Sequence, residues 1–287
     1  MLTLISMKRA SAKPYLYILP ALCLAFLFTF LPLLKAFSVS FLTVGASGQV
    51  RGWAGISNYT GLFQDPWFRK SLLNTLRFTA LFVPLNTFLV LLSSSITRQK
   101  ASKAVEFVFS MPLAVSLASA SLLFKELFKG KVNIINRITG LECPWLESPG
   151  TAMLTLVFLG VFLDFGLDYL LLLSSFRSID KELLDAASLD GASGTQAYWH
   201  IEIPSVKGML SVVVFMALKE AILISAPVMI LTEGGPYRST ETVMYFYYLE
   251  AFKSGNRGVE STIAVLAVLA SLVVMTALSR LRRDDNE

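Results

Sequence analysis

Charged residues are scarce in this chain, and their scarcity excludes an ordinary soluble domain. Only 16% of the 287 residues are Asp, Glu, Lys or Arg, whereas 54% are hydrophobic and the mean hydropathy is +0.62. A soluble domain carries about 25% charged residues. The surplus of apolar residues is gathered into long runs, which places most of the chain inside a bilayer.

Cysteine and histidine are also nearly absent, which argues against a disulfide framework, a metal site and nucleophilic catalysis. Cys23 lies in the first apolar run, Cys143 lies in a loop, and the one histidine is His200. Two dispersed thiols and one imidazole do not form a ligand cluster, and a Ser or Cys nucleophile needs a nearby base. No GxxxxGK[ST] phosphate cradle occurs either. We therefore expect no catalytic residue and no ATP hydrolysis by this chain, and so no enzyme.

Six apolar runs are each close to the roughly 20 residues that a helix needs to cross the hydrocarbon core. We therefore predict an all-α, polytopic membrane protein, with a tail at 1–14 and a single transmembrane domain at 15–287. Its helices are expected at about 15–42, 74–97, 104–128, 151–176, 208–231 and 259–279. Pro112 should kink the third helix, because proline removes a backbone hydrogen bond.

Lysine and arginine are distributed unequally between the two sides of this predicted membrane domain. The side that holds both termini carries twelve, at Lys8, Arg9, Lys13, Arg98, Lys100, Lys103, Arg177, Lys181, Lys207, Arg280, Arg282 and Arg283. The opposite loops carry nine, at Arg51, Arg69, Lys70, Lys129, Lys131, Arg137, Arg238, Lys253 and Arg257. Since cytoplasmic loops are enriched in Lys and Arg, both termini and the loop 177–207 are predicted to be cytoplasmic.

A polar stretch at 178–204 separates two of the long apolar runs. Leucines and alanines recur at roughly helical spacing between positions 183 and 192, and Gly191 supplies freedom for a bend. We predict a short helix, a turn and a second short helix. The small side chains would let the surface of another protein approach the first helix closely. A solvated loop with an amphipathic helix on the bilayer fits the same residues.

This pattern resembles the EAA loop of ABC-importer permeases, which reads Glu-Ala-Ala, two residues, Asp-Gly-Ala and a spacer to Ile-x-Leu-Pro. The matching positions are Asp185, Ala186, Ala187, Asp190, Gly191, Ala192, Ile201 and Pro204. Asp185 replaces the usual Glu, and Ile203 replaces the usual Leu. The resemblance implies that these residues couple the chain to a separate ATPase, whose cleft receives the first short helix.

Two further segments resemble the sugar branch of these permeases. Trp53–Phe78 is similar to a segment that precedes the second core helix, and the matching residues are Asn58, Tyr59, Asp65, Pro66, Phe68, Asn74 and Thr75. Leu231–Phe252 resembles the LTGGGP…TE…AF segment of the maltose-type branch, with Glu233 in place of a Gly. Taken alone, its Gly-Gly-Pro predicts only a tight turn.

The resemblance implies the type I ABC-importer permease fold and a maltose- or glycerol-3-phosphate-type subunit of the bacterial cytoplasmic membrane. The implied function is ATP-driven import of a sugar or oligosaccharide. The implied partners are a second homologous permease, two ATPase subunits, an extracellular solute-binding protein, a sugar-like solute and the lipid bilayer, with no nucleic acid. No cofactor is expected on this chain, because ATP and magnesium belong to the ATPase.

Polar residues inside the predicted spans are candidates for the substrate path, because an ionisable side chain there usually faces a cavity or a partner. Carboxylates and aromatic faces also grip sugar hydroxyls and rings. The candidates are Asp164, Asp168, Tyr169, Lys219 and Glu220. Adjacent Lys219 and Glu220 should not share a helix face. Three alternatives stay open: Asp164 or Asp168 pairs with Lys219 to join two helices, Asp164 or Asp168 sits near the outer interface, or the carboxylates couple an ion gradient in a secondary transporter.

Overall fold

The computed structural model describes residues 13–45, 48–98, 103–130, 133–140 and 142–284, so most of the predicted tail lies outside the described residues. The bounds of its helices are α1 (Lys13–Ala25), η1 (Phe26–Phe30), α2 (Leu31–Val39), α3 (Ser57–Gln64), α4 (Pro66–Thr97), α5 (Lys103–Ser110), η2 (Met111–Ala114), α6 (Leu117–Phe128), α7 (Ile134–Thr139), α8 (Pro149–Arg177), α9 (Lys181–Leu189), α10 (Gly194–Ala197), η3 (Tyr198–Glu202), α11 (Ile203–Leu223), α12 (Ala226–Leu231), α13 (Val243–Leu249), η4 (Glu250–Ser254) and α14 (Arg257–Asp284). A small antiparallel sheet pairs β1 (Leu42–Val44) with β2 (Val50–Trp53).

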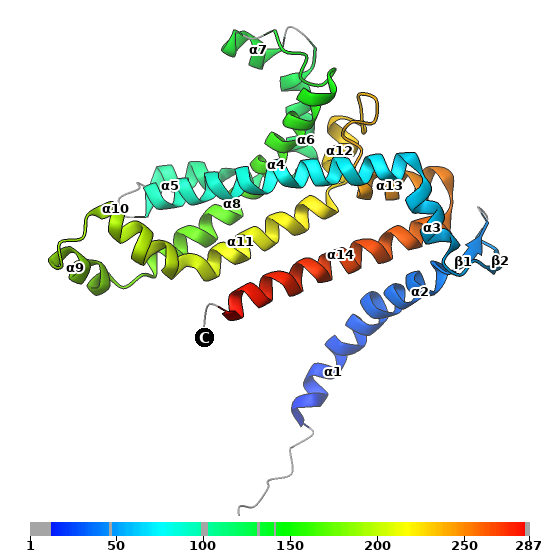
Figure 1. The fold of residues 1–287 in the computed structure, drawn as a ribbon, viewed down its shortest axis with the longest axis horizontal. Coiled ribbons are helices and arrows are strands. Elements are labelled where there is room, and N and C mark those ends of the chain that lie inside the picture. Colours follow the sequence, from blue (N-terminus) through cyan, green and yellow to red (C-terminus); the bar gives the residue numbers. More distant parts are fainter. Residues whose placement is uncertain (1–12, 46–47, 99–102, 131–132, 141, 285–287) are drawn as a thin grey trace, which may run out of the picture.

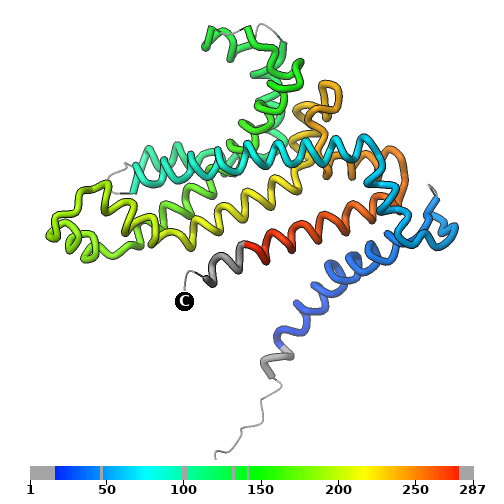
Figure 2. Tube along the Cα trace, viewed as in Figure 1, coloured from blue at the N-terminus to red at the C-terminus, as the bar shows by residue number. Residues whose placement is uncertain are grey.

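Three long helices, α4, α8 and α11, run side by side and form the centre of the molecule (Figure 1). Helix α9 lies at one end of this bundle, and α3 and the strands lie at the other. Phe78, Phe82, Leu156 and Leu159 fill the middle of the core. The N-terminal run α1–η1–α2 stands apart and meets the remainder mainly where α2 packs on α14 (Figure 2). The bundle therefore separates α9 from α3 and the two strands.

Five helical runs of the described chain are long and apolar enough to cross a membrane, or six if the bent pair α5–α6 counts as one span. They overlap the predicted spans, but several ends differ. The second helix begins at Pro66 and not near residue 74, because Asp65 caps it by accepting from the Trp67 and Phe68 amides at 2.6 and 3.3 Å. The first helical run ends at Val39, because β1 follows.

The third predicted helix, 104–128, is not continuous. Between α5–η2 and α6 the chain bends by 99°, so the kink expected at Pro112 is a complete break. Val115 and Ser116 are extended, and the Ser116 hydroxyl then caps α6 by accepting from the Ser119 amide at 3.2 Å. The break packs against α8 at Gly166, where an added Cβ would lie 2.9 Å from the Leu113 nitrogen. A glycine is thus needed for this close approach.

The fifth predicted helix, 208–231, is displaced along the chain. An unbroken helical run begins at residue 194, where α10 starts, and continues through η3 and α11 to Leu223. The chain then becomes extended at Ile224, and α12 follows as a separate short helix with Pro227 in its first turn. The second short helix expected in the polar loop is therefore the beginning of a long span.

Candidate functional site

The polar loop forms a helix, a tight turn and the start of the long α10–α11 run. Asp180 caps α9 by accepting from the Glu182 amide at 3.0 Å. Gly191 has φ +82°, in the left-handed region that favours glycine, and it closes the turn after α9. Ser193 and Gln196 form a capping box at the start of α10. The predicted first helix and the predicted bend at Gly191 are confirmed.

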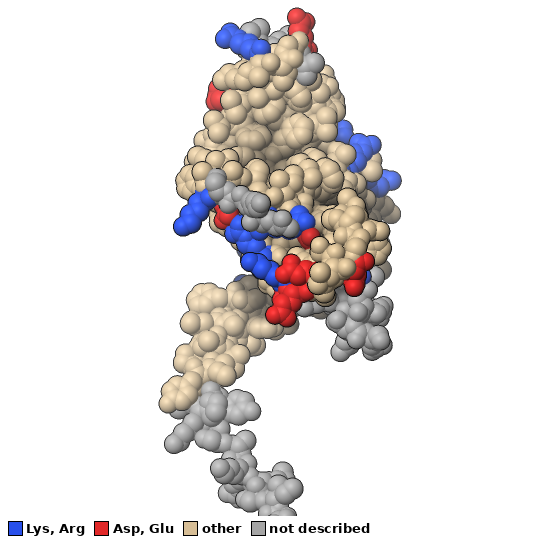
Figure 3. Space-filling model, turned by 90° about the vertical axis from the view of Figure 1, so that its left-hand side faces the viewer, with Lys and Arg blue, Asp and Glu red and all other residues tan. Residues whose placement is uncertain are grey.

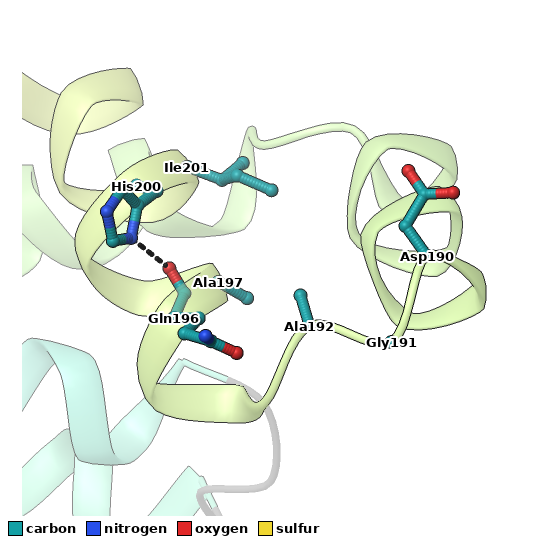
Figure 4. Close-up of a pocket in the computed structure, with 7 residues that line it drawn as sticks. All are labelled: Asp190, Gly191, Ala192, Gln196, Ala197, His200 and Ile201. Atoms are coloured by element: carbon teal, nitrogen blue, oxygen red, sulfur yellow. Dashed lines mark hydrogen bonds between the residues drawn. The ribbon is translucent and has the colours of Figure 1, made fainter.

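A hollow of about 390 Å³ lies between the end of α9 and the α10–η3 helix (Figure 4). Its lining residues are Asp190, Gly191, Ala192, Gln196, Ala197, His200 and Ile201. The small side chains of Ala192 and Ala197 leave the space open, and the His200 ring folds back so that its Nδ1 lies 3.0 Å from the Gln196 carbonyl oxygen. The structure thus brings four residues of the predicted coupling motif together and adds Gln196, Ala197 and His200.

The remaining motif residues lie around this hollow. Asp185 lines a second hollow of about 630 Å³, beside the ends of α4, α8 and η3. Ala186 is exposed on α9, Ala187 is half-buried, and Pro204 is exposed in the first turn of α11. Sequence reasoning missed the residues that α4 and α8 contribute to the second hollow, because these residues are distant from the motif in the sequence.

Exposed apolar side chains accompany charged ones at this end of the molecule. Leu189 is 89% exposed and Trp199 is 63% exposed. Viewed onto the α9 end, acidic and basic side chains gather in one area (Figure 3). Helix α9 itself carries the exposed Lys181, Glu182 and Asp185. Helix α9 packs on α10 and makes few other contacts. Large apolar side chains among charges, on a helix that is otherwise uncovered, are typical of a protein-binding surface.

A second candidate site is a cavity of about 280 Å³ between the long helices and the break after α5. Its lining residues are Phe78, Phe82, Leu117, Gly160, Leu163, Asp164, Glu220, Leu223, Ile224, Ser225, Ala226 and Pro227. Asp164 of α8 and Glu220 of α11 supply the two carboxylates in a lining that is otherwise mostly apolar. The predicted path residues Asp164 and Glu220 therefore share one cavity.

Two other predicted path residues face the helix packing instead of this cavity. Asp168 is 2% exposed, and its Oδ2 accepts from Asn86 Nδ2 at 2.7 Å, which joins α8 to α4. Tyr169 is completely buried, its hydroxyl donates to Thr97 Oγ1 at 2.9 Å, and its ring stacks on Phe165. Tyr169 therefore does not line this cavity, and a role of Asp168 or Tyr169 in the path stays a prediction.

Lys219 does not join two helices through Asp164 or Asp168. Its Nζ lies 2.7 Å from Oε1 of the adjacent Glu220. Although adjacent residues leave a helix in different directions, both side chains are long enough to bend toward each other. The cavity therefore contains one carboxylate paired with a lysine and one without that partner.

The two other signature segments meet at the end of the bundle opposite α9. Asn74 Nδ2 donates to the carbonyl oxygens of Arg238 and Glu241 at 2.9 and 3.0 Å, and the Ser71 hydroxyl donates to Glu241 Oε1 at 2.9 Å. Glu241 also forms an ion pair with Arg238, at 2.6 Å between Oε2 and Nε. The Val243 amide donates to Thr75 Oγ1 at 2.9 Å. These motif residues hold the α12–α13 connection against α4.

Comparison with known proteins agrees with this architecture. Residues 14–283 match the family described as "Binding-protein-dependent transport system inner membrane component". A probable ABC transporter permease protein, YurN of Bacillus subtilis, is 30% identical over 271 residues, which are 91% of this chain and 92% of the relative. The sn-glycerol-3-phosphate transport system permease protein UgpA of Yersinia pseudotuberculosis is 28% identical over 270 residues, which are 91% and 92% of the two chains.

A solved structure shows the same fold. The chain superposes on a bacterial ABC transporter involved in the import of the acidic polysaccharide alginate with a TM-score of 0.81, over 95% of each chain, at 18% identity. The multiple sugar-binding transport system permease protein MsmF of Streptococcus mutans is 28% identical over 255 residues, 87% and 88% of the two chains. The type I importer fold and the family resemblance predicted from the motifs are confirmed. The chain belongs to the inner-membrane components of binding-protein-dependent transport systems.

Proposed function

We propose that this chain imports a carbohydrate as one of two homologous permease subunits, driven by two separate ATPase subunits that dock on α9 and the α10–η3 turn. The proposal rests on the structure of the polar loop. It displays the motif residues beside a hollow, with Leu189 and Trp199 exposed for a partner. An ATPase would cover these apolar side chains and remove their surface from water, which favours docking.

Docking of an ATPase on α9 also fixes the orientation of the chain in the membrane. ATP is in the cytoplasm, so the α9 end is cytoplasmic and the α3 end faces outward, where a solute-binding protein delivers its solute. The C-terminal part of α14 points toward the α9 end, and the bundle separates that end from α3 and the strands (Figure 1). This orientation agrees with the excess of Lys and Arg on the side of the termini.

The cavity favours a neutral polyhydroxylated solute. Asp164 and Glu220 offer hydrogen-bond acceptors to hydroxyl groups, and Phe78 and Phe82 offer apolar faces. Relatives are named for multiple sugars and for sn-glycerol 3-phosphate. The described lining of the cavity contains no Lys or Arg, and Lys219 is engaged with Glu220, so a phosphate group would find no unpaired cation there. A neutral sugar or oligosaccharide therefore fits this chain better than a sugar phosphate.

Purification from the native membrane tests the proposal. We expect the solubilised chain to bring down a second permease and an ATPase that contains a phosphate cradle. In proteoliposomes with the binding protein, uptake of radiolabelled maltose or raffinose should depend on ATP, be inhibited by vanadate and resist protonophores. A chain that purifies alone and transports without ATP would contradict the proposal and would favour ion coupling through Asp164 and Glu220.

A further inference from the structure

The two points where the polar loop joins the bundle each carry an Arg–Glu ion pair. Arg177 is the last residue of α8, and its Nη2 and Nη1 lie 2.5 and 3.2 Å from the two carboxylate oxygens of Glu106 in α5. Glu202 is the last residue of η3, and its Oε2 and Oε1 lie 2.5 and 2.7 Å from Nε and Nη2 of Arg98, which follows α4. The Arg177–Glu106 pair makes two hydrogen bonds and the Arg98–Glu202 pair makes one, and a bidentate pair fixes direction as well as distance.

These pairs form one network, here called the root clamp and defined as Arg98, Glu106, Arg177 and Glu202. Arg177 Nε donates to the Arg98 carbonyl oxygen at 3.4 Å, which links the two pairs. The Glu202 side chain is 4% exposed and that of Arg98 is 21% exposed. The Arg98 guanidinium also lies over the rings of Phe176 and Tyr198, at 5.9 and 5.5 Å from their centroids. The clamp thus lies within the packing at this end of the bundle.

Helix α9 has little other connection to the bundle. It packs on α10, and its remaining route to the spans is the backbone on either side of it. Both backbone routes pass through the root clamp, one at Arg177 and one at Glu202. A displacement of α9 therefore reaches the clamp first.

From the clamp, a packed route leads to the membrane cavity. Glu106 belongs to α5, and α5 continues through η2 to the break that packs against α8 at Gly166. After the break, α6 begins at Leu117, which lines the cavity beside Asp164. The α5–η2 segment therefore runs from the root of the loop to the break, where the start of α6 borders the cavity.

We propose that Arg98, Glu106, Arg177 and Glu202 are positioning residues that pass a displacement of α9 to α5–α6 and so change the shape of the cavity. This inference rests on the proposed docking of an ATPase on α9. Exposed ion pairs contribute little to stability, whereas the nearly buried Arg98–Glu202 pair holds η3 against the end of α4. Removing one partner leaves the other charge buried and uncompensated, so the two elements separate or reorient.

Distance measurements in the full importer complex test the clamp. In a Cys23→Ser, Cys143→Ser background, spin labels at Leu189→Cys on α9 and at Ile138→Cys on α7, which packs on α6, are each paired with Leu76→Cys on α4. The three label positions are 89%, 77% and 58% exposed. Distances are compared without nucleotide and after trapping with magnesium ATP and vanadate. In the otherwise unaltered complex, both distances should change.

Glu202→Gln should separate the response of the α9 label to nucleotide from the response of the α7 label. We expect the α9 distance still to change and the α7 distance to stay fixed, with maltose or raffinose uptake about tenfold lower while ATP hydrolysis continues. The charge-reversed double variant Arg98→Glu, Glu202→Arg should restore the α7 response in part. Glu126→Gln is the control, because it removes an exposed pair with Lys129, 3.9 Å long and 72% and 67% exposed, outside the clamp.

The outcomes separate this inference from the function on which it rests. A normal α7 response in Glu202→Gln, or a loss that the charge reversal does not relieve, would overturn the clamp and leave ATPase docking intact. If Glu202→Gln does not assemble, Glu106→Gln makes the same test at the more exposed pair, whose side chains are 40% and 25% exposed. If α9 does not respond to ATP in the unaltered complex, the proposed function fails, and the clamp fails with it.

Discussion

We expect Gly191→Pro to abolish solute uptake while the protein still reaches the membrane. Gly191 has φ +82°, whereas the proline ring holds φ near about −65°. The turn between α9 and α10 then cannot close, and α9 is presented to the ATPase in a different direction. A conflict of about 3 kcal/mol in the turn corresponds to a loss of about a hundredfold in the docked population. Uptake of radiolabelled maltose or raffinose per amount of membrane-inserted protein measures the effect.

Two further variants identify the backbone of Gly191 as the cause. A Cβ added at Gly191 meets no atom within 4 Å, so Gly191→Ala suffers only the left-handed backbone cost of about 1–2 kcal/mol and should retain part of the uptake. Gly194 is also open to a Cβ but has no positive φ, so Gly194→Ala should transport normally. Normal uptake by Gly191→Pro would show that the turn does not couple the chain to an ATPase.

Asp164→Leu should also weaken uptake strongly, but for a different reason. The carboxylate lines the membrane cavity opposite Glu220 and lacks the lysine that pairs with Glu220. Losing a hydrogen bond from a solute hydroxyl to this side chain costs about 0.5–3 kcal/mol, or about two- to more than a hundredfold in affinity. We therefore expect the Michaelis constant for uptake to rise steeply, with ATPase docking unchanged. Asp164→Asn, which keeps an acceptor, should lose less.

Asp168→Asn is the matched control for Asp164. It lies one helical turn away on α8, but its carboxylate accepts from Asn86 and does not line the cavity. This substitution should lower thermal stability and leave the Michaelis constant for uptake close to its original value. Equal effects of the two substitutions on that constant would contradict the assignment of the cavity to the solute. Transport of sn-glycerol 3-phosphate in preference to maltose and raffinose would contradict the proposed preference for a neutral solute.

The loop shows which parts of the fold the sequence could predict. Small residues at helical spacing and Gly191 predicted α9 and its turn, because both depend on local backbone preferences. The continuous run through Pro204 could not be foreseen, since proline usually interrupts a helix. In the structure, η3 forms a wider π-helical turn in which the Ile203 amide donates to the Tyr198 carbonyl oxygen just before Pro204. The same arrangement of η1 precedes Pro32.

Inside the membrane, the sequence predicted which side chains were polar but not where each one would point. Asp164 and Asp168 are four residues apart and share a face of α8, so periodicity assigns them equal roles. Asn86 on α4 donates a hydrogen bond to Asp168, which is therefore buried between α4 and α8. The cavity beside Asp164 lies at the break after α5. The root clamp could not be predicted from the sequence either, because its contacts depend on how distant helices pack. Arg98 and Glu202 are 104 residues apart in the sequence.

Photocrosslinking from α9 tests the central claim most directly, namely that the polar loop docks on an ATPase. A photoreactive amino acid in place of Leu189, the 89% exposed residue at the end of α9, should crosslink in native membranes to a protein that contains a phosphate cradle. The same probe in place of Leu76, which is 58% exposed on α4, should not reach that protein. A Leu189 probe that crosslinks only to lipid, or to no ATPase, would contradict the account.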